Sequence, residues 1–572
     1  MSNLPPGLLL LLAPLLGLVR QPLVRRVGFV LLPVLSLVHL ACFVPEGTIV
    51  NATWMGIDLV PVRADRIALI WGWVFHVAAI LSAIYGLHRN DVLQPTMGLG
   101  YAGSAIAAVF AGDLLSLFLF WELTAITSVF LVWGGQTPQS YRAGLRYLLV
   151  QVGSGVLLLA GTLVLYSETG QLRFGGLGET GVLLADVGRW SGALILVAFG
   201  IKAAFPLLHT WLADAYPEAS PTGTVFLSAF TTKLAIYALL RGFAGWEPLI
   251  AVGSVMALVP LVYAVAENDM RRCLAYCLNN QLGFMVVAVG VGSELAINGA
   301  AAHAVAHILY KGLLFMAAGA VLYRVGTARI SRLGGLAGAM PVTFLCYLVG
   351  VAAISMPPFS GFVTKSMSLS AVAEAHHETA WICLLVATAG VFWVCGPRLI
   401  YQVFLAPSDA STSTPQDAPW NMKVAMAITA ALCLLIGLFP IVLYRWLPYD
   451  LGYRPYTVPH VVGQLQLMAF ASLTFLVCVS QGWLPNRVGW RMLDVDWFVR
   501  GPFQRLIGTV AIGLAHLKRL TEHAVHRVGL RVYQKLSDRM ADDGGHTPFK
   551  ETGQMAMWAA VMLILYLLVY YG

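Results

Sequence analysis

Several charged or titratable side chains of this chain lie inside stretches that otherwise resemble membrane-spanning helices. Placing a charge at the centre of a lipid bilayer costs about 3 kcal/mol or more. Such residues persist where they face a polar interior, and there they most often carry protons or ions. The chain is therefore a transporter candidate. The residues are Glu122, Lys202, Lys233, His303, His307, Lys311 and Lys365.

Lys202 and Glu122 have the chemistry of a two-position proton switch. Burial disfavours the charged form of either group, whereas a close opposite charge favours it. A lysine paired to the glutamate stays protonated, and one that parts from it in a dry site releases its proton. We predict this role for the pair. The alternative is a static buried ion pair that fixes helix packing.

His303, His307 and Lys311 follow one another at intervals of four residues. This spacing puts all three on one face of a helix, and histidine titrates near neutral pH. We favour a proton relay along the membrane normal over a core hydrogen-bonding role or a zinc site, because no carboxylate accompanies the histidines. Lys233 lies too deep in its helix to favour a side chain that reaches the surface. Lys365 would end the relay.

The composition indicates a membrane protein with many spans. Of the 572 residues, 59% are hydrophobic and 11% are charged, against about 25% charged in soluble proteins. The net charge of +8 does not indicate nucleic-acid binding, because the basic residues lie in short loops between apolar runs. The eight cysteines are scattered, and Cys273 and Cys277 have no further His or Cys partners nearby in sequence. We therefore predict no cofactor and no metal, and interpret these two cysteines as packing residues.

The apolar runs predict an all-α protein of about sixteen transmembrane helices. Loops after odd-numbered helices are rich in Arg and His, and those after even-numbered helices carry mainly Glu and Asp. Positive loops mark the cytoplasmic side, so both termini are predicted to lie outside a multi-pass inner (cytoplasmic) membrane protein. The first run is interpreted as a span, because arginines follow it. The predicted helices are 7–19, 27–44, 66–87, 97–112, 114–133, 143–166, 191–212, 222–243, 247–266, 274–292, 297–323, 341–373, 379–405, 422–446, 461–483 and 554–571.

Two of the predicted helices, the seventh and the twelfth, contain helix-breaking motifs. Pro206 closely follows Lys202, and Pro357-Pro358 precedes Lys365. Proline removes a backbone donor, and broken helices at matching places in two halves indicate inverted repeats around an ion path. We therefore predict two inverted five-helix repeats. The predicted domains are N-terminal helices 1–96, a first repeat 97–245, a second repeat 246–406, two helices within 407–496, an amphipathic segment 497–545 and a C-terminal helix 546–572.

The segment 497–545 differs in kind from the rest. Leu506, Val510, Leu514 and Leu517 form an apolar face, and lysines and arginines mark the opposite one. This pattern is typical of a lateral helix that lies in the membrane interface. A calmodulin-like target or a soluble tail is the alternative.

Several motifs around the charged residues resemble the antiporter-like subunit family. This family includes the proton-pumping membrane subunits of respiratory complex I and the large subunits of Mrp-type multisubunit Na+/H+ antiporters, and the D-type subunit of the latter is the most similar. The resemblance covers about residues 65–400. The motifs are Phe120-Trp121-Glu122-Leu123-Thr124, Lys202 with Pro206-Leu207-Leu208-His209-Thr210-Trp211-Leu212, Arg272 with Leu274-Ala275-Tyr276 and Gln281-Leu282-Gly283, His303 with His307 and Lys311-Gly312-Leu313-Leu314-Phe315, and Pro357-Pro358-Phe359-Ser360-Gly361-Phe362 with Lys365.

The resemblance implies a row of buried charges that starts at the Glu122–Lys202 pair and ends at Lys365. It also implies partners: other membrane subunits, H+ and Na+, and the lipid bilayer, with no nucleic acid. We predict a proton-translocating, non-enzymatic subunit of a Na+/H+ antiporter complex. The alternatives are a pump subunit of a complex I-like NADH/quinone oxidoreductase and a membrane energising subunit of an inorganic-carbon uptake system. Ala213 and Asn279-Asn280 depart from the family pattern, and the long C-terminal end departs from the D-type pattern.

Overall fold

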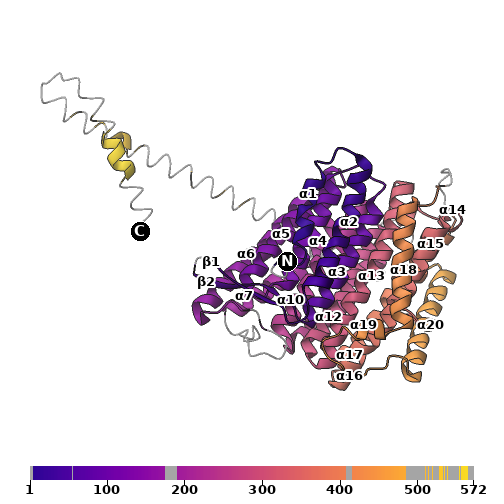
Figure 1. Cartoon of the computed structure of the whole chain (residues 1–572). Helices are drawn as coiled ribbons and strands as arrows, with labels where there is room; N and C mark the ends of the chain where they lie inside the picture. The colour runs from indigo at the N-terminus through magenta and orange to yellow at the C-terminus, as the bar shows by residue number, and fades with distance from the viewer. Residues whose placement is uncertain are drawn as a thin grey trace. The chain divides into compact units, whose positions relative to one another are not determined.

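The computed structural model describes residues 4–54, 56–173, 175, 190–407 and 415–484, with scattered positions between 509 and 563 (Figure 1). The chain divides into two compact units, Met1–Asp494 and Val495–Gly572. In the second unit, residues 556–563 are helical. Our predictions for 497–545 and for the rest of 546–572 fall, apart from single positions, outside the described residues.

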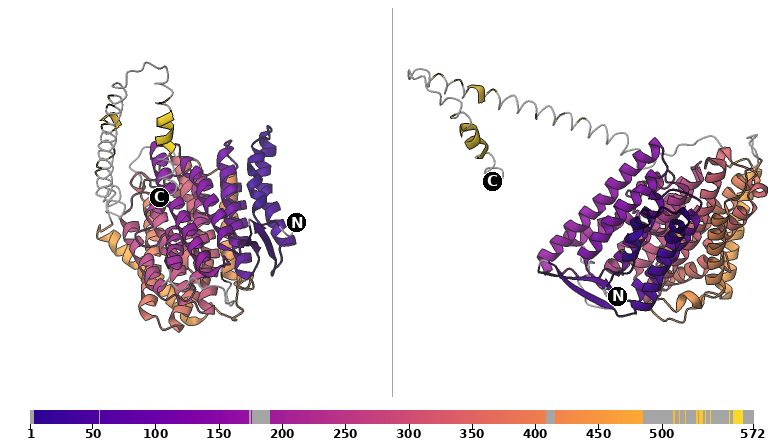
Figure 2. Two further views of the ribbon diagram at one scale, coloured as in Figure 1. Left: turned by 90° about the vertical axis from the view of Figure 1, so that its left-hand side faces the viewer. Right: turned by 45° about the horizontal axis from the view of Figure 1, so that its top comes forward.

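The first unit is a bundle of helices, seen from two further directions in Figure 2. Twelve helical stretches in the described part of the chain are long and apolar enough to cross a membrane. The predicted all-α membrane fold is confirmed, although the number sixteen is not. The main helices are α2 (Pro22–Phe43), α3 (Arg66–Gly86), α4 (Leu93–Phe110), α5 (Leu114–Trp133), α6 (Pro138–Thr169), α7 (Trp190–Ala203), α8 (Thr210–Ala215), α9 (Pro221–Ala229), α10 (Thr231–Phe243), α11 (Pro248–Ala266), α12 (Met270–Val291), α13 (Glu294–Val325), α15 (Pro341–Ser355), α16 (Ser360–Glu374), α17 (Glu378–Trp393), α18 (Trp420–Leu438) and α20 (Val458–Ser480).

Two elements near the N-terminus differ from the sequence prediction. The first apolar run forms a short 3₁₀ helix, η1 (Leu8–Leu12), and a short α1 (Ala13–Leu16), because Pro14 lacks a backbone donor and restarts the helix. Between α2 and α3 the chain forms an antiparallel hairpin of β1 (Ile49–Trp54) and β2 (Ile57–Arg63). Gly56, with φ of +79°, lies at the turn. The sequence analysis did not anticipate these strands.

The seventh predicted helix is broken between α7 and α8, as the proline motif indicates. The chain turns through Ala204, where φ is +61°, and the ring of Phe205 folds back over Gly200. A Cβ atom at Gly200 would lie 2.5 Å from that ring, so only glycine fits there. The break frees the carbonyl of Ile201, and the indole of Trp211 donates to it at 2.9 Å.

The twelfth predicted helix is likewise broken, between α15 and α16. Gly361 packs so closely on the end of α15 that a Cβ atom there would lie 2.2 Å from the carbonyl oxygen of Ala353. Gly437 of α18 approaches the carbonyl oxygen of Pro358 in the same way, at 2.0 Å from a built Cβ atom. The two breaks thus occur where the sequence predicted them, beside Lys202 and Lys365.

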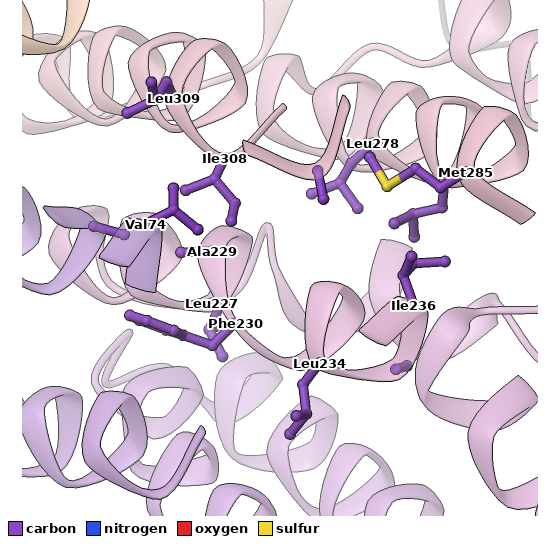
Figure 3. Close-up of a cluster of buried hydrophobic side chains, with 14 of the residues drawn as sticks. Val74, Leu227, Ala229, Phe230, Leu234, Ile236, Leu278, Met285, Ile308 and Leu309 are labelled. Carbon is purple, nitrogen blue, oxygen red and sulfur yellow. The ribbon is translucent and has the colours of Figure 1, made fainter. Parts of the chain in front are cut away.

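A further break separates α9 from α10 at Phe230, where the backbone has φ −103° and ψ −68°. The chain beyond it continues within one buried apolar stretch, Pro221–Phe243. Apolar side chains surround this junction, among them Val74 of α3 and Ile308 of α13 (Figure 3). Neighbouring helices therefore cover the irregular backbone, as irregular backbone at membrane depth requires.

Helix α13 is the core of the first unit. It packs against α3, α9, α12, α15, α16 and α18, and nearly all of its apolar window is buried. After α17, two π-helical turns, η3 (Val394–Arg398) and η4 (Ile400–Leu405), carry a kink at Gly396. The kink brings Cys395 toward α13, with consequences described below.

Candidate proton-transfer axis

Lys202 is fully buried near the C-terminal end of α7, and its amine contacts neutral groups of α5. Nζ donates to the carbonyl oxygen of Trp121 at 2.6 Å and to Thr124 Oγ1 at 3.0 Å. The same nitrogen lies 4.3 Å from the centre of the Trp121 ring. Within the described residues, no ion pair joins Lys202 to Glu122. The structure therefore holds the two groups in a parted arrangement, although they interact electrostatically.

Glu122 lies half-buried on α5 and faces α6. Its Oε1 is buried and makes no hydrogen bond within the described residues. The carboxylate occupies the space over Gly155, where a Cβ atom would lie 1.4 Å from Oε1. One turn earlier on α6, the amide of Gln151 is buried and likewise without a hydrogen bond among the described residues. Unpaired buried polar groups of this kind leave places for water or a cation.

Lys233 follows the α9–α10 junction and is fully buried. Its side chain turns back to α9, where Nζ donates to the carbonyl oxygen of Ser228 at 2.5 Å. The backbone carbonyl of Lys233 accepts from the indole of Trp71 at 3.1 Å. The break at Phe230 thus frees a carbonyl that receives the lysine. The amine does not reach the surface of the chain.

His303 and His307 lie fully buried on one face of α13, as their spacing predicts. Their rings are nearly parallel, with centres 6.0 Å apart. His303 Nδ1 lies 3.0 Å from Thr364 Oγ1, whereas its Nε2 and both ring nitrogens of His307 have no hydrogen bond within the described residues. Tyr310 packs against both rings. The row thus offers ring nitrogens that are open to water.

Lys311, one turn beyond His307 on α13, meets a cysteine rather than a carboxylate. Its Nζ lies 3.9 Å from Cys395 Sγ, and both residues are fully buried. Cys395 is placed there by the kink at Gly396, and the hydroxyl of Tyr347 donates to the Cys395 carbonyl at 2.7 Å. The sequence analysis missed this cysteine. Its one signal was the Gly396-Pro397 dipeptide, which is typical of a break in a helix.

Lys365 lies just after the second break and is 2% exposed. Its Nζ donates to Ser355 Oγ at 2.9 Å, so the amine joins α16 to the last residue of α15. The ring of Phe284 lies 4.8 Å from the same nitrogen. The end of the predicted relay is therefore held by a neutral hydroxyl and an aromatic face.

The structure places these residues in two groups. The first is Glu122 with Lys202. The second is centred on α13, where His307 interacts electrostatically with Lys233, His303, Lys311 and Lys365. Helices α7 and α10 pack against each other and connect the two groups. Among the described residues, no group of three or more His, Cys, Asp or Glu side chains has the arrangement of a metal site.

Other charged residues have structural partners. Asp113 caps α5, accepting from Ser116 N at 2.7 Å. Asp214, expected in a solvated loop, instead lies in α8 and pairs with Arg146 at 2.7 Å. Arg271 is buried and donates to backbone carbonyls after α8. These charges fix the packing of helices around the axis.

The fold and the row of buried lysines define a polytopic membrane subunit of the ion-translocating kind. The chain belongs to the family described as NADH:quinone oxidoreductase/Mrp antiporter, TM, which it matches over residues 111–448. That region holds every residue of the two groups and is more than half of the chain.

Known proteins support this assignment. The chain is 29% identical to Hydrogenase-4 component B of Escherichia coli over 66% of its own length, and 29% identical to a Na(+)/H(+) antiporter subunit of Alkalihalophilus pseudofirmus over 70%. The matches span only 62% and 55% of those proteins. A chain of the membrane-bound sulfane sulfur reductase, an archaeal respiratory membrane complex, has the same fold, with a TM-score of 0.72, 23% identity and coverage of 99% of this chain and 100% of that one.

Proposed function

We propose that this chain is the proton-translocating subunit of a monovalent cation (Na+)/H+ antiporter complex, with protons moving along the Glu122, Lys202, Lys233, His303, His307, Lys311 and Lys365 axis. One observation carries the proposal: four buried lysine amines form no ion pair with any carboxylate among the described residues. Their contacts are carbonyl, hydroxyl and thiol groups.

The physical reason is the cost of an isolated buried ammonium. Such a charge is strongly disfavoured, so an amine held only by neutral acceptors gives up its proton more readily than one in an ion pair. Glu122 is the group that reverses this balance. When its carboxylate swings from Gly155 toward Lys202, the ammonium is favoured, and when it returns, the proton passes on.

The relatives support the transport class and the presence of other membrane subunits. One matched relative is named as a subunit of a Na+/H+ antiporter. A second candidate function is a proton-pumping subunit of a complex that couples pumping to electron transfer. The observation that favours it is the match of nearly the whole chain to a subunit of an archaeal respiratory complex.

The test uses the complete complex in everted membrane vesicles. A pH-sensitive dye reports the response of a preformed pH gradient to added Na+, K+ or Li+. We expect Lys202→Ala and Glu122→Ala to lower the response about tenfold or more, while Lys423→Ala, which changes a partly exposed lysine of α18, leaves it unchanged. Wild-type rates in both axis variants would refute the axis. A gradient formed by an electron donor and quinone, without any response to added cations, would favour the second candidate.

A further inference from the structure

A groove on the surface of the first unit lies away from the axis. It encloses about 550 Å³ between α2, the end of α3 and the start of α18. One wall is an apolar stripe of α2, and the mouth carries Arg26, His88 and Asn421. The stripe consists of Leu23, Val27, Val30, Leu31 and Val34.

Unpaired donors gather at the mouth of this groove. Arg26 Nε and His88 Nε2 are buried yet make no hydrogen bond within the described residues, and the same is true of Arg324 Nε at the end of α13. The ring of Tyr323 packs edge-on against His88, with centres 4.8 Å apart. The Arg324 guanidinium lies 5.7 Å from that ring. Three elements therefore direct cationic or N–H groups to one place.

The hydrogen bonds at the mouth fix the direction of these donors. The amide of Asn421 lies 3.2 Å from His88 Nδ1, so with the amide donating, the proton of His88 is on Nε2. Arg26 Nη2 donates to Asn90 Oδ1. The neighbouring carboxylate, Asp91, accepts from Leu93 N at 2.9 Å as a helix cap. The positive charge at the mouth is therefore not cancelled by Asp91 directly.

The protonation of His88 is consistent with an excess of positive charge. Burial, together with Arg89, Arg324 and Arg26, lowers the pKa of His88 to about 4. His88 is then a neutral donor at pH 7 beside three guanidinium groups. An unsatisfied cluster of this kind matches a phosphate group, which accepts several charge-assisted hydrogen bonds.

The apolar stripe specifies the rest of the ligand. It extends over eleven residues of α2, or about 16 Å along the helix axis, which is the scale of a lipid acyl chain. Trp420, 68% exposed at the rim, is typical of a side chain at the membrane interface. We propose that this groove is a binding site for an anionic phospholipid, whose phosphate contacts Arg26, His88 and Arg324 and whose acyl chain follows the α2 stripe.

The experiment uses the complex purified with its natural partners in mild detergent. Thermal unfolding is followed after adding dioleoylphosphatidylglycerol or, as a zwitterionic match, dioleoylphosphatidylcholine. We expect stabilisation by the anionic lipid alone. Arg26→Gln and Arg324→Gln should weaken its half-saturating concentration about tenfold. Arg25→Gln, on the same helix but outside the groove, is the control and should bind as the wild type does.

A second measurement separates the lipid from other occupants and from unfolding. Native mass spectrometry of the complex should show phosphatidylglycerol or cardiolipin retained by the wild type and lost from Val30→Trp, in which the new ring fills the stripe. Equal stabilisation by both lipids, full retention in Arg26→Gln, or density for a helix of a neighbouring subunit in the groove would each overturn the proposal.

Discussion

The carboxylate of Glu122 occupies the space that a side chain at Gly155 would need, since a Cβ atom there would lie 1.4 Å from Oε1. Two residues of α6 that differ only in their surroundings therefore provide a sharp comparison. Gly153 has no heavy atom within 4 Å of its built Cβ atom.

We predict that Gly155→Ala displaces Glu122 and lowers cation-dependent proton transport about tenfold or more, because small misplacements of a reacting group are costly. Gly153→Ala should transport normally and stabilise α6 by about 1 kcal/mol, the helix propensity difference. Transport assays in vesicles and thermal unfolding measure the two effects. Normal transport by Gly155→Ala would show that the position of Glu122 does not matter.

Replacing Lys202 by arginine tests whether this residue must lose its proton. A guanidinium keeps its charge under all working conditions, so Lys202→Arg should retain assembly but lose most transport. Lys423→Arg on α18 is the matched control, with transport expected at the wild-type rate. Proton uptake by vesicles, normalised to the amount of assembled complex, is the measurement. Retained transport in Lys202→Arg would argue for a fixed charge in place of a relay.

Cys395 is expected to serve the axis through Lys311, because its sulfur lies 3.9 Å from the amine. Removing the thiol leaves Lys311 without this contact, so Cys395→Ala should lower transport roughly tenfold. Cys395→Ser keeps a polar group there and should retain a larger fraction. Cys433→Ala removes another buried thiol, on α18, and serves as the control. Transport rates measured across a pH series would separate a proton-transfer role from a loss of packing, which lowers all rates equally.

The ion pair between Asp65 and Arg241 predicts a pH dependence of stability. Burial raises the pKa of Asp65, but the Arg241 guanidinium and its hydrogen bonds outweigh burial, and the net pKa lies below the ordinary 3.8. A lowered carboxyl pKa adds stability that is fully present above the unfolded pKa and is lost as pH falls through the folded pKa. The stability gap between wild type and Asp65→Asn should therefore be large at about pH 6 and shrink toward about pH 3.

Thermal unfolding in detergent over this pH range measures the gap. Glu46→Gln, which removes the partner of Arg66 in a more exposed pair at 3.2 Å, is the control and should change stability by less than about 1 kcal/mol. A gap for Asp65→Asn that stays constant with pH would mean that the pair contributes through packing and not through charge.

The sequence by itself determined the membrane class, most helices and the members of the axis. Apolar runs long enough to span a bilayer are a local property, and so is the spacing of His303, His307 and Lys311 on one helix face. Proline acts on its own helix, so the breaks beside Lys202 and Lys365 were also predictable. The hairpin at residues 49–63 was missed, although its β-branched residues and Gly56 were a signal.

Only the tertiary structure decided which groups meet. Cys395 is 84 residues from Lys311 in the chain, and a kink in one helix brings it to the face of another. The parting of Lys202 from Glu122 likewise depends on how α5, α6 and α7 pack, since Gly155 provides the space for the carboxylate. Helix periodicity specifies which side chains share a face. The contacts between faces follow from the packing of the whole bundle, which no local pattern encodes.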